Sequence, residues 1–289
     1  MKKKILSLFL VMLTIVCSFA NTVFADQENV VSLGADLTPK QQEEMLEHFG
    51  VKRDEVRIIE VTNQEERDYL SGLVPDKQIG TRAISSAYVQ LLPKGEGIMV
   101  DTHNITWVSK EMYANAMVTA GIEDAKVIVA APFNVSGTAA LTGIMKAFEE
   151  ISGEELSDEA KKTANEELVL TGDLGEEVGQ EEAAELIKKV KEEVVLNKPK
   201  DESEIEDIIR DIAKQLGIEL TDEQIAKIIE LMKKISQLNL NVETITKQLD
   251  KIGISVDDIK KTVEENKGIL EKILDAITEF FSWVRSFFK

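Results

Sequence analysis

The feature of this chain that most constrains its fold is a nearly continuous apolar run at Ala125–Ala131, AKVIVAA. A strand that is covered on both faces has such a run, whereas a half-exposed strand alternates apolar and polar residues. Pro132 follows the run, and from Ser136 onward the pattern is that of a helix reaching about Ile151. We therefore expect a strand that is covered on both faces.

The segments before this run have the pattern of a mixed α/β domain. Val30–Leu33 and Val56–Val61 are short β-branched runs that are typical of strands. Between them, Thr38-Pro39-Lys40-Gln41 combines an N-cap, a first-turn proline and a capping-box glutamine. Gly50 then follows as a stop signal, so a helix is predicted between the two strands.

Two further strands are predicted at Ala83–Leu92 and Gly97–Val108. The turn residues Pro93–Gly97 lie between them, which favours a hairpin. A helix is predicted at Lys110–Ala120, with Gly121 as its end.

From Ser152 onward the pattern is almost entirely helical, and Asn197-Lys198-Pro199-Lys200 is the clearest linker. We expect an α+β or α/β amino-terminal domain followed by an all-α helical region. The predicted divisions are a signal peptide at 1–25, a mixed α/β domain at 26–152, an acidic helical extension at 153–196, a linker at 197–200, and a helical module at 201–289 that ends in an amphipathic helix.

The first 25 residues have the order of a cleavable secretory signal peptide. Three lysines at 2–4 precede an apolar run at 5–19, and Val23-Phe24-Ala25 stands before Asp26. The alternative is an uncleaved anchor, but the run is shorter than the about 20 residues that a spanning helix needs. We expect a secreted or extracytoplasmic protein, either free or associated with the cell surface. Cleavage would remove Cys17, the only cysteine, and with it disulfides and thiol catalysis.

The charge of the chain restricts its partners. The net charge is −19, and loss of the three signal lysines would make it −22. Nucleic acids and anionic surfaces require clustered Lys and Arg, so we expect no nucleic-acid partner. No apolar run after residue 25 is long enough to cross a bilayer, and we expect no integral span after cleavage.

The stretch from Ala131 to Ala140 is the most distinctive candidate site. A turn that delivers the start of a helix at the end of a strand offers free N–H groups to an anion. On this interpretation the ligand residues are Asn134, Ser136, Gly137 and Thr138. The alternative is structural, with Ser136 as an N-cap and small residues that allow close packing on the sheet. The stretch has neither a phosphate-loop pattern nor G-x-S-x-G around Ser136.

The histidines and carboxylates do not predict a catalytic or metal site. Asp101 and His103 alternate on a predicted strand, and the other histidine, His48, falls on a predicted helix that we expect to be distant. A metal needs a third or fourth ligand, so we predict no metal, no cofactor and no catalytic residues. A paired-carboxylate hydrolase stays an alternative, although the few Trp and Tyr residues do not favour a sugar cleft.

The end of the chain is strongly amphipathic. From Ile269 to Phe288, apolar residues occupy one half of a helical wheel, with aromatic residues gathered near the end. The face closes the chain's own helical bundle, docks on a protein partner, or makes a peripheral contact with a membrane. As a docking face it comprises Ile273, Ile277, Phe280, Phe281, Trp283, Val284, Phe287 and Phe288.

Several motifs resemble a known family. These are Gly121-Ile122, Ala125-Lys126-Val127, Ala131-Pro132-Phe133, and above all the run from Ser136 to Ile144, SGTAALTGI. From residue 26 to about 195 the chain resembles the YpuA-like family, exported proteins of Firmicutes whose shared domain has no known function. The resemblance implies an extracytoplasmic protein of a Gram-positive envelope and brings no catalytic residues with it.

Together these patterns favour a non-catalytic envelope protein that binds an envelope protein partner or supports wall and membrane homeostasis. The alternatives are a hydrolase of an envelope polymer and a small-anion binding module at the Ser136 helix start.

Overall fold

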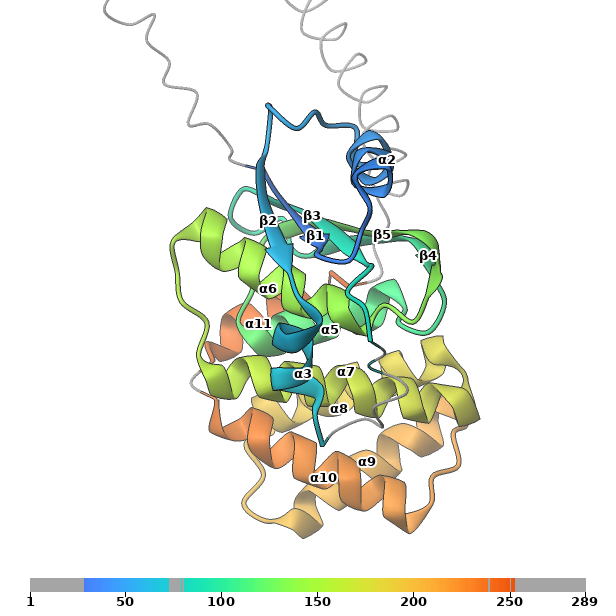
Figure 1. The fold of residues 1–289 in the computed structure, drawn as a ribbon. Helices are drawn as coiled ribbons and strands as arrows, with labels where there is room; N and C mark the ends of the chain where they lie inside the picture. The colour runs from blue at the N-terminus through green and yellow to red at the C-terminus, as the bar shows by residue number, and fades with distance from the viewer. Residues whose placement is uncertain (1–28, 73–78, 80, 239, 250, 253–289) are drawn as a thin grey trace, which may run out of the picture.

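The computed structural model describes residues 29–72, 79, 81–238, 240–249 and 251–252. Across these ranges an amino-terminal mixed sheet with its helices is followed by a series of helices, as the sequence predicted (Figure 1). The predicted signal peptide at 1–25 and the predicted amphipathic helix at 269–288, with its docking face, lie outside the described residues.

The sheet has five strands in the order β2-β1-β3-β5-β4. β1 pairs in parallel with β2, and β4 pairs in parallel with β5. β3 is antiparallel to both of its neighbours, β1 and β5, so the other four strands all run in one direction. The strands are β1 Val30–Gly34, β2 Arg57–Val61, β3 Ser86–Leu91, β4 Met99–Ile105 and β5 Ala125–Val135.

The apolar run at Ala125–Ala131 lies in β5, between β3 and β4. Val127 and Val129 of β5 belong to the large core on one face of the sheet. Ala130 belongs to a second core on the other face. The prediction of a strand that is covered on both faces is therefore confirmed, and its apolar residues contribute to the cores on both sides of the sheet.

The predicted hairpin between β3 and β4 is wrong. The two strands are consecutive in the chain, but β5 lies between them and pairs with both. β5 is apolar on both faces and is stabilised by burial between two neighbours, whereas β4 has an exposed stretch, Asp101–His103, that suits an edge. β5 also continues past Pro132 to Val135; β3 pairs with it only as far as Ala130, so the proline follows the end of that ladder.

One face of the sheet is covered by α2 (Pro39–Phe49). The predicted capping box is present, with Thr38 and Gln41 each bonding the other's backbone, and Gly50 ends the helix in the left-handed conformation. α2 contacts β5, and its buried residues Met45, Leu46 and Phe49 share one core with residues of β1, β3 and β5.

The opposite face carries α5 (Lys110–Ala120) and α6 (Thr138–Ser152). α6 lies very close to β1. A β-carbon at Gly143 would stand only 2.5 Å from the hydroxyl oxygen of Ser32, so there is no room for a side chain at this position. Small residues thus allow this helix to pack tightly on the sheet.

The remaining helices are α3 Asn63–Leu70, α7 Asp158–Val178, α8 Gln180–Asn197, α9 Glu202–Leu216, α10 Asp222–Gln237 and α11 Val242–Leu249. Helices α7 and α8, and then α9 and α10, form layers beyond α5 and α6 (Figure 1). A single cluster of buried residues continues from the sheet through these layers, for example from Val129 through Leu168 and Ile187 to Ile228. Within the described ranges no helix is both long and apolar enough to span a membrane.

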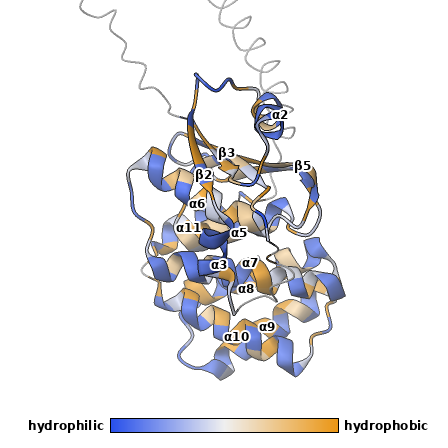
Figure 2. Cartoon of the chain, viewed as in Figure 1, coloured by the Kyte–Doolittle hydropathy of each residue, from blue (hydrophilic) through white to orange (hydrophobic). Residues whose placement is uncertain are grey.

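Figure 2 shows mostly apolar strands and a short helix α3 that is almost entirely hydrophilic. α3 follows the end of β2 and packs against α6 and α7. A hydrophilic helix in such a position brings polar side chains toward the interior, and one of them, Glu66, is buried.

Candidate functional site

The turn between β5 and α6 differs from the structural interpretation of the sequence. α6 begins at Thr138, its N-cap is Gly137 with φ of 98°, and no side chain caps it. Ser136 is therefore not the N-cap. A β-carbon at Gly137 would lie 2.5 Å from the Tyr113 hydroxyl and 2.5 Å from a methyl group of Ile105, and the left-handed backbone also favours glycine. The backbone conformation at Gly137 thus sets the helix start one residue later than the serine pattern predicted.

Tyr113 of α5 supports the turn between β5 and α6. Its side chain is completely buried, and its hydroxyl donates a hydrogen bond to the carbonyl oxygen of Gly137. Burial raises the pKa of Tyr113 well above its ordinary value, and the nearby Glu66 carboxyl raises it further. The phenol therefore stays a neutral donor, and the turn has a fixed support.

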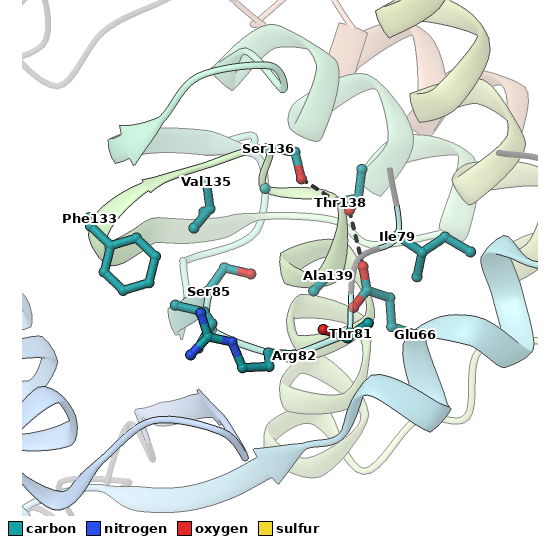
Figure 3. Close-up of a pocket in the computed structure, with 12 residues that line it drawn as sticks. Glu66, Ile79, Thr81, Arg82, Ser85, Phe133, Val135, Ser136, Thr138 and Ala139 are labelled. Carbon is teal, nitrogen blue, oxygen red and sulfur yellow. Dashed lines mark hydrogen bonds between the residues drawn. The ribbon is translucent and has the colours of Figure 1, made fainter. Parts of the chain in front are cut away.

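A pocket of about 260 Å³ opens at this turn (Figure 3). β1, β2, β4 and β5 run in one direction, so their carboxyl ends meet at this edge of the sheet, which is where open α/β sheets bind ligands. Its apolar wall includes Ile84, Phe133, Val135 and Ala139. Its polar lining consists of Glu66, Thr81, Arg82, Ser85, Ser136 and Thr138.

Three of the four predicted site residues therefore come together here. Ser136, Gly137 and Thr138 all line the pocket. Asn134 is exposed on β5 and lies outside the pocket lining. In Figure 3 the hydroxyls of Ser136 and Thr138 face each other, with a distance of 3.5 Å between the two oxygens.

Glu66 is the residue at the floor of the pocket that the sequence analysis missed. It is only 1% exposed, and it accepts hydrogen bonds from Thr138 Oγ1 at 3.0 Å and from Asn63 Nδ2 at 3.2 Å. Burial raises the pKa of Glu66 to about 7, although both hydrogen bonds and the nearby Arg67 act to lower it. One signal was available, because Glu66 lies four residues before the fully buried Leu70 and so shares its helix face.

The rim of the pocket is formed by an aromatic ring and a cation. Phe133 of β5 is 43% exposed, and the guanidinium of Arg82 lies on the segment before β3. Figure 3 shows both side chains beside Ser85, whose hydroxyl points into the pocket. The lining thus joins an apolar surface to several polar groups, as small-molecule sites do.

Within the part of the chain that the structure describes, no base lies beside Ser136. A nucleophilic serine needs a base within about 3 Å, and its hydroxyl here faces another hydroxyl, that of Thr138. Among the described residues that line this pocket there is no histidine and a single carboxylate, Glu66. This described lining does not hold the groups of a serine hydrolase or of a paired-carboxylate hydrolase.

The two histidines are neighbours, which corrects the expectation that they are distant. His48 of α2 stacks on His103 of β4, with ring centroids 4.3 Å apart and an interplanar angle of 29°. Desolvation lowers the pKa of His48, and the charge of His103 lowers it further. Over the part of the chain that is described, no group of three or more His, Cys, Asp or Glu side chains is placed to hold a metal ion.

Comparison with known proteins gives a family and no activity. A family model described as a protein of unknown function (DUF1002) matches residues 33–252. The uncharacterized protein YpuA of Bacillus subtilis (strain 168) is 42% identical over 263 residues, which covers 90% of this chain and 89% of that protein. No solved structure matches this chain. The resemblance seen in the sequence motifs is confirmed, and the chain belongs to the DUF1002 family of proteins of unknown function.

Proposed function

We propose that this protein is an exported, extracytoplasmic binding protein of the Gram-positive envelope, and that its ligand site is the pocket at the start of α6. The observation that carries the proposal is the convergence of Ser136, Gly137 and Thr138 with the buried Glu66 at the carboxyl edge of the sheet. The signal pattern of residues 1–25 supports the location.

Binding is favoured over catalysis by the chemistry of the pocket. The pocket offers hydroxyls, one carboxyl and one guanidinium around an apolar wall, which can hold and orient a small polar molecule. Ser136 has no base beside it among the described residues, and glycoside cleavage would need a second carboxyl at a set distance.

The ligand site can be tested by backbone amide NMR of the purified protein during titration with small-molecule fractions from the envelope. We expect the largest shift changes at the amides of Gly137, Thr138 and Ala139. Phe133→Ala should weaken binding, whereas Leu196→Ala should not, because Leu196 is similarly exposed, at 47% against 43%, but belongs to α8. Shift changes confined to another surface would overturn this assignment.

The location has its own test. Fractionation of producing cells should recover the protein outside the cytoplasm, with an amino terminus at Asp26. Recovery of an intact, cytoplasmic chain would contradict the export part of the proposal.

The proposal includes an envelope protein partner that docks on the apolar face at the end of the chain, between Ile269 and Phe288. The pattern of that segment supports docking, because aromatic residues are enriched in interfaces. Deletion of residues 267–289 should release the protein from its surface fraction and remove the partner in a pull-down. Unchanged fractionation and unchanged partners would exclude docking through this segment.

A further inference from the structure

Arg82 is a cation without a partner at the rim of the pocket. The chain has 53 acidic residues against 34 basic ones, so most basic side chains have carboxylates within reach. Within the described structure, the exposed guanidinium of Arg82 nevertheless makes no ion pair and no hydrogen bond. It therefore has all five of its donors available to a bound molecule.

Ser85 gives an independent indication of a ligand. Only 8% of this residue is exposed, and it lines the pocket with its hydroxyl directed inward (Figure 3). No hydrogen-bond partner for this hydroxyl occurs among the residues described. The Ser85 oxygen is not one of the fully buried side-chain atoms that lack a partner, so it is accessible from the pocket. This hydroxyl is therefore free to form a hydrogen bond with a molecule that enters the pocket.

The third set of donors is the first turn of α6. Its N–H groups at Thr138 and Ala139 have no intrahelical acceptor, and no side chain caps the helix. This end of a helix carries a partial positive charge and favours an anion. Thus the guanidinium, the hydroxyl and the helix start all present donors to one space, and the apolar wall formed by Phe133 and Ile84 lies beside them.

Resting on the proposed function, we infer that the pocket binds a small carboxylate with an apolar substituent, and that Glu66 carries a proton when this ligand is bound. A planar carboxylate matches the fork of an arginine, and a pocket of about 260 Å³ has room for a short apolar body. An ionised Glu66 would repel the ligand from a buried position at the same helix start.

The surroundings of Glu66 allow it to hold that proton near neutral pH. The groups that face it are Asn63 and Arg67 from its own helix α3, Thr138 from α6 and the neutral Tyr113 from α5, and Arg82 lines the same pocket. Burial dominates over these contacts and raises the pKa of Glu66 to about 7. Deprotonation of Glu66 above neutral pH should therefore compete with binding.

The experiment is isothermal titration calorimetry of the purified protein with N-acetylalanine, whose carboxyl is ionised at pH 6 and at pH 8. Affinity should be about tenfold weaker at pH 8 than at pH 6, because the protonated fraction of Glu66 falls by that factor. Binding near pH 8 should take up close to one proton, measured in buffers of different ionisation enthalpy. In Glu66→Gln the pH dependence and the proton uptake should both disappear.

Matched variants test the other two contacts. Arg82→Gln should abolish measurable binding, whereas Arg210→Gln, on α9, should leave binding unchanged. Ser85→Ala should weaken binding roughly threefold to tenfold, the value of one hydrogen bond, with Ser236→Ala on α10 as its control. Thermal unfolding of each variant shows whether the variant is folded.

Further titrations distinguish a free small carboxylate from the carboxyl terminus of a peptide. Trialanine with a free carboxyl terminus should bind and its amide should not, and binding of the peptide alone would assign the pocket to peptide ends. Equal binding of the amide, stronger binding of inorganic phosphate, or no effect of Arg82→Gln and Ser85→Ala would overturn the carboxylate inference. If an uncharged molecule shifted the amides of Gly137 and Thr138 while these carboxylates did not, the proposed pocket would stand and this inference alone would fail.

Discussion

Lys191 Nζ lies 2.7 Å from Glu167 Oε1 in the interior, where each side chain is only 1% exposed. The ammonium also donates to the Asn115 carbonyl oxygen at 2.8 Å and to Thr119 Oγ1 at 3.0 Å, so each of its three protons has an acceptor. Burial lowers the pKa of Lys191, while Glu167 acts to raise it. This fully bonded pair ties α8 to α7 and, through its other contacts, to α5.

Removal of one partner should leave a buried charge without compensation. We expect Lys191→Met to lower the free energy of unfolding by about 3–5 kcal/mol, measured by urea denaturation. The double variant Lys191→Met, Glu167→Gln should recover part of this loss, because no buried charge then remains. Lys189→Met, which breaks a more exposed pair with Glu185 on the same helix, should cost at most about 1 kcal/mol. Equal losses for Lys191→Met and Lys189→Met would contradict this account.

Glu66 should make the stability of the protein fall as pH rises toward neutral. Its pKa is raised by burial from the ordinary value of 4.5 to about 7, so between these values the folded protein keeps a proton that the unfolded chain releases. The free energy of unfolding should therefore fall by roughly 2–3 kcal/mol between pH 5 and pH 8 through this group alone.

Comparison of the wild type with Glu66→Gln isolates that contribution. Urea denaturation at both pH values should show a smaller fall in the variant, which has no titrating group at this position. Glu44→Gln, an exposed glutamate on α2, should keep the wild-type fall. The same fall in Glu66→Gln as in the wild type would show that the buried carboxyl does not titrate in this range.

The close approach of α6 to the sheet predicts a cost for a single methyl group. In Gly143→Ala the new β-carbon would stand 2.5 Å from Ser32 Oγ. Overpacking of this kind costs about 1–3 kcal/mol, which exceeds the gain of about 1 kcal/mol in helix propensity. Adding Ser32→Ala removes the clashing oxygen, so urea denaturation should find the double variant more stable than Gly143→Ala. Strict additivity of the two changes would contradict a direct clash.

Local patterns predicted the elements of the fold well, because their signals lie within a few residues. The capping box at Thr38 and Gln41 sets the start of α2, and Gly121 ends α5 in the left-handed conformation. The strand at Ala125–Ala131 was predictable from its apolar pattern alone, since residues that are apolar on both faces must be covered on both faces.

The strand order and the candidate site depended on contacts between distant segments. Nothing in the turn between β3 and β4 shows that β5 will lie between them. Ser136 is by pattern the better N-cap, but the left-handed Gly137, which contacts Tyr113, is the N-cap in the structure. Glu66 lies in a hydrophilic helix that packs against α6 and α7, and Thr138 of α6 bonds its carboxyl. The sequence thus indicated only the part of the pocket lining that comes from one continuous segment, the turn between β5 and α6.

The contact between His48 and His103 predicts an effect on the pKa of His48 that the sequence did not suggest. Desolvation and then the charge of His103 lower the pKa of His48 below its ordinary value of 6.5. In His103→Gln the second cause disappears, so the midpoint of the His48 ring signals in an NMR titration should rise while staying below 6.5, since desolvation remains. His103→Lys keeps a positive charge at this position and should hold the midpoint near its wild-type value. An unchanged midpoint in His103→Gln would show that the stacked rings do not interact electrostatically in solution.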